Sequence, residues 1–122
     1  MAKVLIIEDN AANMTLATFL LQWAGYSLLS ATDAEAGLTL ARDERPDLIL
    51  MDIQLPGMDG LQATRLLKRD EATRAIPVVA VTVLAMKGDE ERIRAAGCDG
   101  YIAKPMHYNE VLATIADQLA RT

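Results

Sequence analysis

The sequence has a single cysteine, Cys98, among its 122 residues, so it cannot form an internal disulfide. One unpaired thiol fits a reducing compartment, and we expect a cytoplasmic location. No apolar run approaches the roughly 20 residues that a membrane span needs. Met1–Lys3 leads straight into a strand pattern, without the features of a signal peptide. We therefore expect a protein that uses neither disulfide bonds nor a membrane.

Positive charge and aromatic residues are also scarce. The chain carries 12 Lys and Arg against 17 Asp and Glu, a net charge of -5. A module that binds nucleic acid needs a basic face, so we expect no nucleic-acid partner. Aromatic residues make up 4% of the chain while hydrophobic residues make up 52%, which predicts a well-filled aliphatic core and not a disordered tail.

The length of the chain suits one domain, and we expect a single domain over residues 1–122 with no output domain. Short apolar runs alternate with segments of helical periodicity. The expected strands are Val4–Ile7, Ser27–Ala31, Leu48–Met51, Val78–Val81 and Tyr101–Ala103. The expected helices are Asn10–Ala24, Thr32 or Asp33 to Asp43, Asp59 or Gly60 to Lys68, Lys87–Ala96 and Asn109–Ala120.

This alternation predicts the α/β class. Strands that are almost wholly apolar indicate a parallel sheet covered on both faces. The expected architecture is a doubly wound, flavodoxin-like three-layer sandwich with five parallel strands in the order 2-1-3-4-5. In such folds the functional site lies beyond the carboxyl ends of the strands.

Polar residues stand where four of these strands end. Glu8 and Asp9 follow the first strand, and Asp52 ends the apolar run Leu48–Met51, just before a turn rich in Pro and Gly. Thr82 follows the fourth strand, and Lys104 with Pro105 follows the fifth. The predicted strand order brings these ends together at one edge of the sheet. We therefore expect three carboxylates, one hydroxyl and one ammonium to converge.

Such a group of residues favours phosphoryl-transfer chemistry. Three neighbouring acids repel one another and require a cation or a proton. Oxygen ligands without His or Cys suit Mg²⁺, with Mn²⁺ as a second possibility. The metal and Lys104 would neutralise phosphoryl oxygens, leaving Asp52 to act as a nucleophile that forms an acyl phosphate.

On these residues the chain resembles the response-regulator receiver family of two-component signalling. The resemblance implies that Asp52, in Leu50–Pro56, is the phospho-acceptor, assisted catalytically by Thr82 and Lys104. It also implies that Thr82 and Tyr101 are switch residues and that the Lys104–Pro105 peptide is cis. The implied metal ligands are Asp9, Asp52, the main-chain carbonyl of Gln54 and, through water, Glu8.

The resemblance implies partners as well. A histidine kinase or a histidine phosphotransfer protein would donate the phosphoryl group, with Met14 and Met106 as candidates for the docking region. A downstream protein target would bind the face formed by the fourth helix, fifth strand and fifth helix. The run Met86–Arg94 is most similar to DivK-like single-domain regulators of cell division and differentiation.

Val83 departs from the family pattern, in which the residue after the switch hydroxyl is small, often Ala. Its two methyl groups, fixed by β-branching, are expected to lie beside the phosphoryl pocket and to slow entry of a donor or water.

Three other functions are compatible with part of the pattern. A phosphatase with an aspartyl-phosphate intermediate would carry a second acid two residues after the nucleophile, where this chain has Gln54. A pseudo-receiver scaffold would not need intact acids and Lys104. A flavodoxin would need a phosphate-binding loop after the first strand, where Glu8 and Asp9 would repel phosphate. We therefore expect a phosphorylation-controlled signalling module that is not an enzyme beyond slow self-phosphorylation and self-dephosphorylation.

Overall fold

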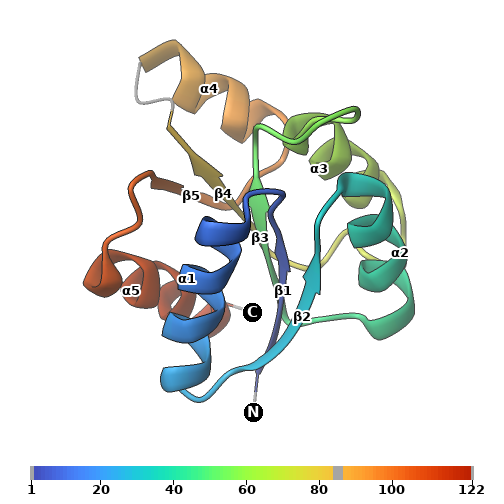
Figure 1. Cartoon of the computed structure of the whole chain (residues 1–122). Coiled ribbons are helices and arrows are strands. Elements are labelled where there is room, and N and C mark those ends of the chain that lie inside the picture. Colours follow the sequence, from blue (N-terminus) through green and yellow to red (C-terminus); the bar gives the residue numbers. More distant parts are fainter. Residues whose placement is uncertain (1, 84–86, 122) are drawn as a thin grey trace.

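A parallel sheet forms the centre of the computed structural model, which describes residues 2–83 and 87–121. Its five strands follow the order β2-β1-β3-β4-β5 (Figure 1). The strands are β1 (Lys3–Ile7), β2 (Ser27–Ala31), β3 (Leu48–Asp52), β4 (Val78–Thr82) and β5 (Gly100–Ala103). The predicted fold class and strand order are confirmed.

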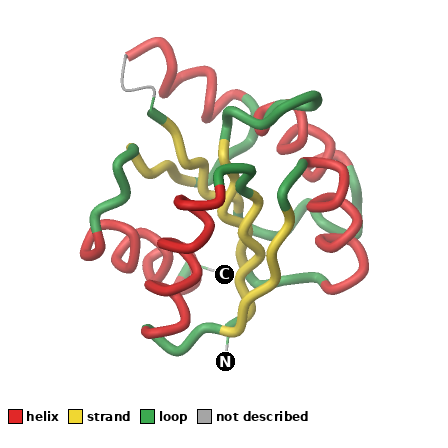
Figure 2. Tube along the Cα trace, viewed as in Figure 1, coloured by secondary structure: helices red, strands yellow, loops and turns green. Residues whose placement is uncertain are grey.

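Helices follow the strands in alternation and cover both faces of the sheet (Figure 2). They are α1 (Ala11–Trp23), α2 (Ala34–Glu44), α3 (Gly60–Arg69), α4 (Lys87–Ala95) and α5 (Tyr108–Ala120). Every predicted strand and helix is present, with ends that differ by a residue or two. Each helix among the described residues is too short or too polar to cross a bilayer.

Side-chain caps fix where three of the helices begin. Asn10, Asp33 and Asp59 each accept a hydrogen bond from the backbone N–H three residues later, at 2.9, 2.8 and 2.8 Å. These bonds satisfy N–H groups that have no partner inside the helix. Of the alternatives that the sequence left open, Asp33 caps α2 and Asp59 caps α3. Ala24, where the predicted first helix ends, is the exposed C-terminal cap of α1.

Alternate side chains of each strand face opposite sides of the sheet and build two cores. Leu5 and Ile7 of β1 pack into one core with α2, α3 and α4, while Val4 and Ile6 pack into the other with α1 and α5. Figure 1 shows the same division, with α1 and α5 on one side of the sheet and α2 and α3 on the other. Because both faces are covered, the polar edge beyond the strand ends is the natural place for a site.

Gly60 lets the first turn of α3 approach the end of β3 closely. A Cβ atom on Gly60 would overlap the backbone carbonyl of Asp52 and lie 2.8 Å from the Cα of Ile53. The Gly60 N–H also donates to the Ile53 carbonyl at 2.9 Å. Glycine at this position therefore fixes the distance between α3 and the loop that follows Asp52.

We expect Gly60→Ala to destabilise the fold by about 1–3 kcal/mol, because the new methyl group meets backbone that cannot move aside easily. Gly88, near the start of α4, is a matched control: a Cβ there meets nothing within 4 Å. Gly88→Ala should leave stability unchanged or raise it by a few tenths of a kcal/mol, since Ala favours helix. Urea unfolding of the three proteins measures both effects, and equal stability of the two variants would contradict the prediction.

Candidate functional site

The candidate site lies where the strand order reverses, beyond the ends of β1 and β3. These strands are neighbours, and Ile7 pairs with Met51 at the ends of their ladder. Glu8 and Asp9 continue from β1, and Asp52 is the last residue of β3. In open parallel sheets this reversal leaves a crevice at the carboxyl edge, which is where ligands bind. The sequence-predicted acids are therefore brought together in the expected place.

The three carboxylates are close and differ in exposure. Glu8, Asp9 and Asp52 each present an oxygen within 4.8 Å of the other two. Glu8 is 4% exposed and Asp52 is 3% exposed, whereas Asp9 lies open to solvent. The arrangement has a buried pair at its base and an accessible third acid at its mouth.

Lys104 supplies the positive charge at the site. Its Nζ lies 3.4 Å from Glu8 Oε1 and 3.3 Å from Asp52 Oδ2, and its side chain is 13% exposed. The Lys104 N–H donates to the Thr82 carbonyl at 2.7 Å, which ties the end of β5 to the end of β4. The Lys104–Pro105 peptide is cis, as the family resemblance implied. One ammonium thus contacts the two buried carboxylates of the cluster.

Backbone N–H groups orient the two buried carboxylates. The Asn10 N–H donates to Glu8 Oε2 at 3.2 Å, and the Gln54 N–H donates to Asp52 Oδ1 at 3.0 Å. Each acid therefore has one oxygen held by backbone and the other facing Lys104. This hydrogen bond holds the main chain of Gln54 next to the Asp52 carboxylate. That the Gln54 carbonyl is a metal ligand stays a prediction.

Burial and neighbouring carboxylates shape the electrostatics of the site. Burial and a side-chain hydrogen bond with Asp52 raise the pKa of Glu8 from 4.5 to about 7. The charged form of this carboxyl is disfavoured chiefly because the side chain is withdrawn from water, and a second carboxylate lies beside it. A hard divalent cation with oxygen ligands would stabilise ionised carboxylates here, so the residues present fit Mg²⁺.

The remaining predicted residues lie around this centre. Thr82 is fully buried at the end of β4. Tyr101 is half-buried in β5 and packs against the core beneath α2, α3 and α4. Val83 is 52% exposed. Its predicted effect on donor entry stays a prediction.

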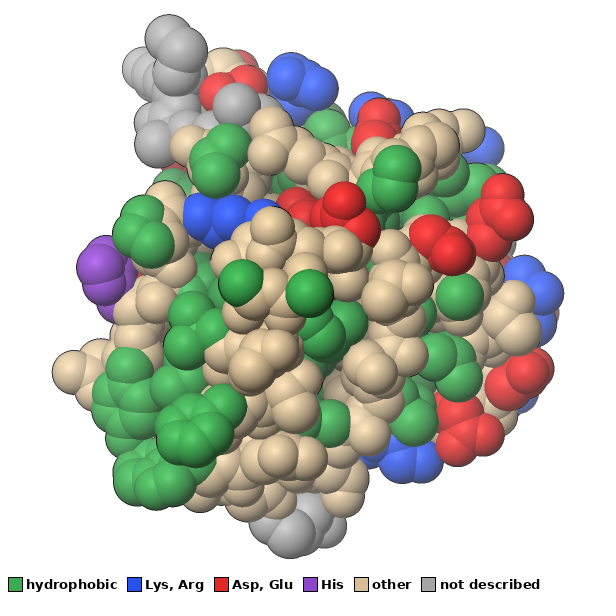
Figure 3. Space-filling view, in the orientation of Figure 1, with side chains coloured by type: hydrophobic (Ala, Val, Ile, Leu, Met, Phe, Trp, Pro, Cys, Tyr) green, Lys and Arg blue, Asp and Glu red, His purple; other side chains and the backbone are tan. Residues whose placement is uncertain are grey.

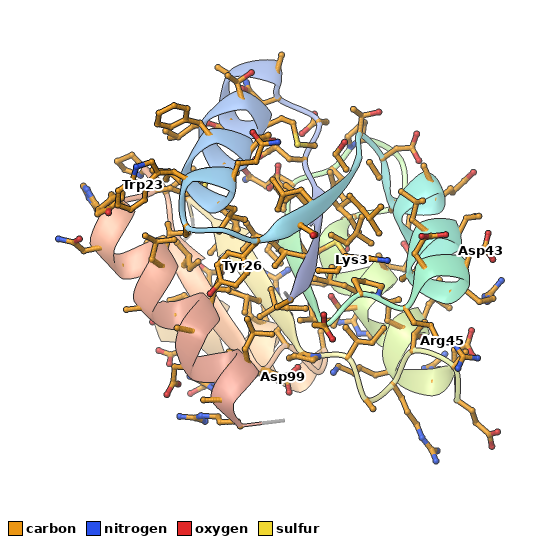
Figure 4. The ribbon with its side chains drawn as sticks, turned by 90° about the horizontal axis from the view of Figure 1, so that it is seen from below. Lys3, Trp23, Tyr26, Asp43, Arg45 and Asp99 are labelled. Atoms are coloured by element: carbon orange, nitrogen blue, oxygen red, sulfur yellow. The ribbon has the colours of Figure 1, made fainter. Side chains whose placement is uncertain are left out.

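The structure also shows where Met106 and Trp23 lie. Met106 does line a small hollow together with Glu8 and Asp52, so it lies beside the site. Trp23, the last residue of α1, is 67% exposed and makes an edge-to-face contact with Tyr108, with ring centroids 5.5 Å apart. Figure 4 shows Trp23 at the end of α1 that lies next to α5.

Comparison with known protein families and sequences gives a consistent result. The family model described as "Response regulator receiver domain" matches residues 4–116. The chain is 51% identical over 117 residues to the polar-differentiation response regulator DivK of Brucella anthropi, covering 96% of this chain and 95% of that protein. It has the same identity and coverage with DivK of Brucella ovis.

Solved structures with the same fold include other receivers. A putative response regulator from Chloroflexus aurantiacus superposes with a TM-score of 0.94 at 25% identity, covering 98% of both chains. The receiver domain of a sensor histidine kinase from Pseudomonas aeruginosa superposes with a TM-score of 0.91 at 34% identity, again covering 98% of both chains. That structure was solved with a magnesium ion coordinated in its active-site cleft.

The raised pKa of Glu8 predicts how stability depends on pH when no metal is bound. The folded protein binds more protons than the unfolded chain between pH 4.5 and about 7. The contribution of Glu8 to the free energy of unfolding is therefore fully present below pH 4.5 and is lost as the pH rises through about 7. Urea unfolding at a series of pH values in chelator measures this fall.

Glu8→Gln is the control for that measurement, because the amide keeps the shape of the side chain and does not titrate. The variant should lose most of the fall in stability across this pH range. Excess Mg²⁺ should also flatten the dependence in the unsubstituted protein, since a cation stabilises the ionised acids. An identical pH dependence in Glu8→Gln would show that another group is responsible.

Proposed function

The chain belongs to the response regulator receiver family of two-component signalling proteins, and from this premise we propose that Asp52 is its phospho-acceptor. A histidine kinase or phosphotransfer protein is the donor, and the phosphorylated form switches partner binding through Thr82 and Tyr101. The observation that carries the proposal is the cluster of Glu8, Asp9 and Asp52, whose oxygens lie within 4.8 Å of one another. Lys104 contacts the two buried members of that cluster, Glu8 and Asp52, at 3.4 and 3.3 Å.

The proposed reaction is an in-line transfer from a phosphohistidine. A carboxylate oxygen of Asp52 forms the new O–P bond while the N–P bond of the donor breaks. The electron pair of that bond stays on the imidazole nitrogen, which then takes up a proton. Lys104 neutralises charge on the phosphoryl oxygens, and the backbone bond from Gln54 keeps the Asp52 carboxylate in place.

When bound, Mg²⁺ adds charge neutralisation at the carboxylates and at the phosphoryl oxygens. We assign its ligands to Asp9, Asp52 and the Gln54 carbonyl, with Glu8 acting through water, and Mn²⁺ could replace it. Asp9 is the exposed member of the acid cluster, so it gives an incoming ion access to the buried pair.

The competing enzymatic function has less support. A phosphatase would need a general acid near the acceptor, and Gln54, two residues after Asp52, is an exposed amide. Receiver domains form a family of signalling proteins and not of classical enzymes. Slow self-phosphorylation and self-dephosphorylation are part of the proposal, as are the single-domain organisation and the cytoplasmic location.

Helix α1 offers a surface for the donor. None of its 13 residues is charged, and Leu16, Phe19 and Trp23 are 41%, 66% and 67% exposed. Figure 3 shows hydrophobic side chains gathered over the lower part of α1 and the adjacent α5. Because α1 begins right after Asp9 and Asn10, a helical donor packed on it would be close to Asp52. The output surface in this proposal is the α4-β5-α5 face.

We expect Asp52→Asn to abolish phosphorylation by acetyl phosphate and Mg²⁺, because the amide matches the shape of the carboxylate but cannot attack phosphorus. Intact-protein mass spectrometry would show one added phosphoryl group on the unsubstituted protein and none on the variant. Asp59→Asn is the matched control, since Asn also caps a helix and Asp59 lies outside the acid cluster. Chelator should stop uptake in every protein. Equal labelling of Asp52→Asn would refute the assignment.

We expect the Thr82→Ala variant to be phosphorylated at Asp52 but to undergo a smaller conformational change on phosphorylation. In the proposed switch the hydroxyl donates a hydrogen bond to the phosphoryl group worth about 1 kcal/mol, so its loss should lower the equilibrium constant for switching about fivefold. Backbone amide shifts of Tyr101 and Ile102 by NMR, before and after phosphorylation, measure the switched population. Thr39→Ala, on an exposed face of α2, is the control. Full-sized shift changes in Thr82→Ala would remove Thr82 from the switch.

A further inference from the structure

A second hollow lies at the opposite edge of the sheet from Asp52. It has a volume of about 270 Å³ and is formed where α2 and α3 meet, towards the ends of both helices. We call it the α2–α3 groove and define it by Leu38, Arg42, Leu66, Leu67 and Arg69. The role proposed for Asp52 does not use it.

The floor of the groove is apolar. Leu67 is almost fully buried and belongs to the core, whereas Leu38 is half-buried and Leu66 remains 39% exposed. The volume is just below the range of about 300–1,000 Å³ typical of small-molecule pockets. It therefore suits one or two inserted side chains better than a whole cofactor.

The rim of the groove carries an excess of positive charge. Arg42 Nε donates to Asp70 Oδ2 at 3.1 Å, so the one carboxylate of the lining is already paired. A backbone hydrogen bond from Ala72, the bond from Arg42 and the charge of Arg45 together lower the pKa of Asp70. Figure 4 shows Arg45 at the end of α2, close to α3.

Arg69 adds a second arginine to a lining that holds one carboxylate, Asp70. Within residues 2–83 and 87–121, neither Arg69 nor Arg65 forms an ion pair. The two are four residues apart on an exposed face of α3, and like charges at that spacing destabilise a helix slightly. The lining, with two arginines and one aspartate, thus has a small positive excess in a chain whose net charge is -5.

We propose that the α2–α3 groove binds an acidic segment of a partner protein, with an apolar side chain against Leu38 and Leu66 and flanking carboxylates facing Arg69 and Arg42. The apolar floor favours such a segment over inorganic phosphate, which would leave Leu66 exposed. The rim disfavours a basic or a purely apolar segment. The site lies on a different edge from the donor and output surfaces, so it can be occupied at the same time.

The test uses the full chain, labelled with ¹⁵N, and a defined peptide set. The probes are capped octapeptides with Asp or Glu at the outer positions and Leu, Ile, Phe or Trp at the two central positions, pooled at millimolar total concentration. A second pool replaces Asp and Glu by Asn and Gln, and inorganic phosphate is a third probe. NMR shift changes locate binding, and the tightest acidic peptide is then titrated.

Two groove variants and two control variants distinguish binding in the groove from nonspecific binding elsewhere on the protein. Leu66→Ser should weaken binding about tenfold and Arg69→Gln about threefold. Leu28→Ser replaces a half-buried leucine of β2, outside both the groove and the donor surface, and Arg121→Gln replaces an exposed arginine at the end of α5. Both controls should bind the acidic peptide as the unsubstituted protein does.

Shift changes centred on Leu38 and Leu66, lost in the groove variants and kept in the controls, would support the proposal. Absence of binding by the acidic pool, equal binding by the amide pool, or equal loss in the control variants would overturn it. Shift changes at the groove with inorganic phosphate alone would also overturn it, in favour of a simple anion site. Acetyl-phosphate labelling of the same samples reports on Asp52 separately, so failure of one proposal is distinguishable from failure of the other.

Discussion

Repulsion among three neighbouring carboxylates is the constraint on which the rest of this site depends. Glu8, Asp9 and Asp52 lie within 4.8 Å of one another, and two of them are buried. They cannot spread apart, because the strands that carry them are joined side by side through a buried ladder. Lys104 contacts two of the three carboxylates, and burial together with the neighbouring Asp52 still raises the pKa of Glu8. Any added positive charge or proton at this edge is therefore favoured.

The same edge links charge at Asp52 to the distant strands. Lys104 contacts Asp52 through its side chain and the Thr82 carbonyl through its backbone N–H. The ends of β3, β4 and β5 are therefore linked through this one residue. Tyr101 lies in β5, three residues before Lys104, which directly follows that strand. In the proposed function, a phosphoryl group on Asp52 would draw Lys104 and Thr82 inward, and the backbone hydrogen bond between these two residues joins the ends of β4 and β5. The energy required is modest, because a few kcal/mol moves a two-state balance.

The sequence predicts the fold and the composition of the site because both follow from local patterns. Apolar runs bounded by turns identify strands, and their order along the chain brings Asp52 and Lys104 to one edge. Tertiary packing decides what the patterns leave open. The sequence does not reveal that Glu8 is almost fully buried and shares a hydrogen bond with Asp52, nor that Trp23 stays exposed against Tyr108. The burial of Glu8 and the exposure of Trp23 depend on the directions of individual side chains, and no periodic pattern in the sequence predicts those directions.

The α2–α3 groove could not be found from the sequence for the same reason, since Leu66 and Arg69 there look like the solvated face of an amphipathic helix. The position of the groove suggests how binding there could affect Asp52. Helix α3 has the groove near its last turn and Gly60 at its first, where it packs against the Asp52 carbonyl. A closely packed helix of ten residues transmits a shift along its axis with little loss. An occupant of the groove and a phosphoryl group on Asp52 would therefore act on opposite ends of one rigid element.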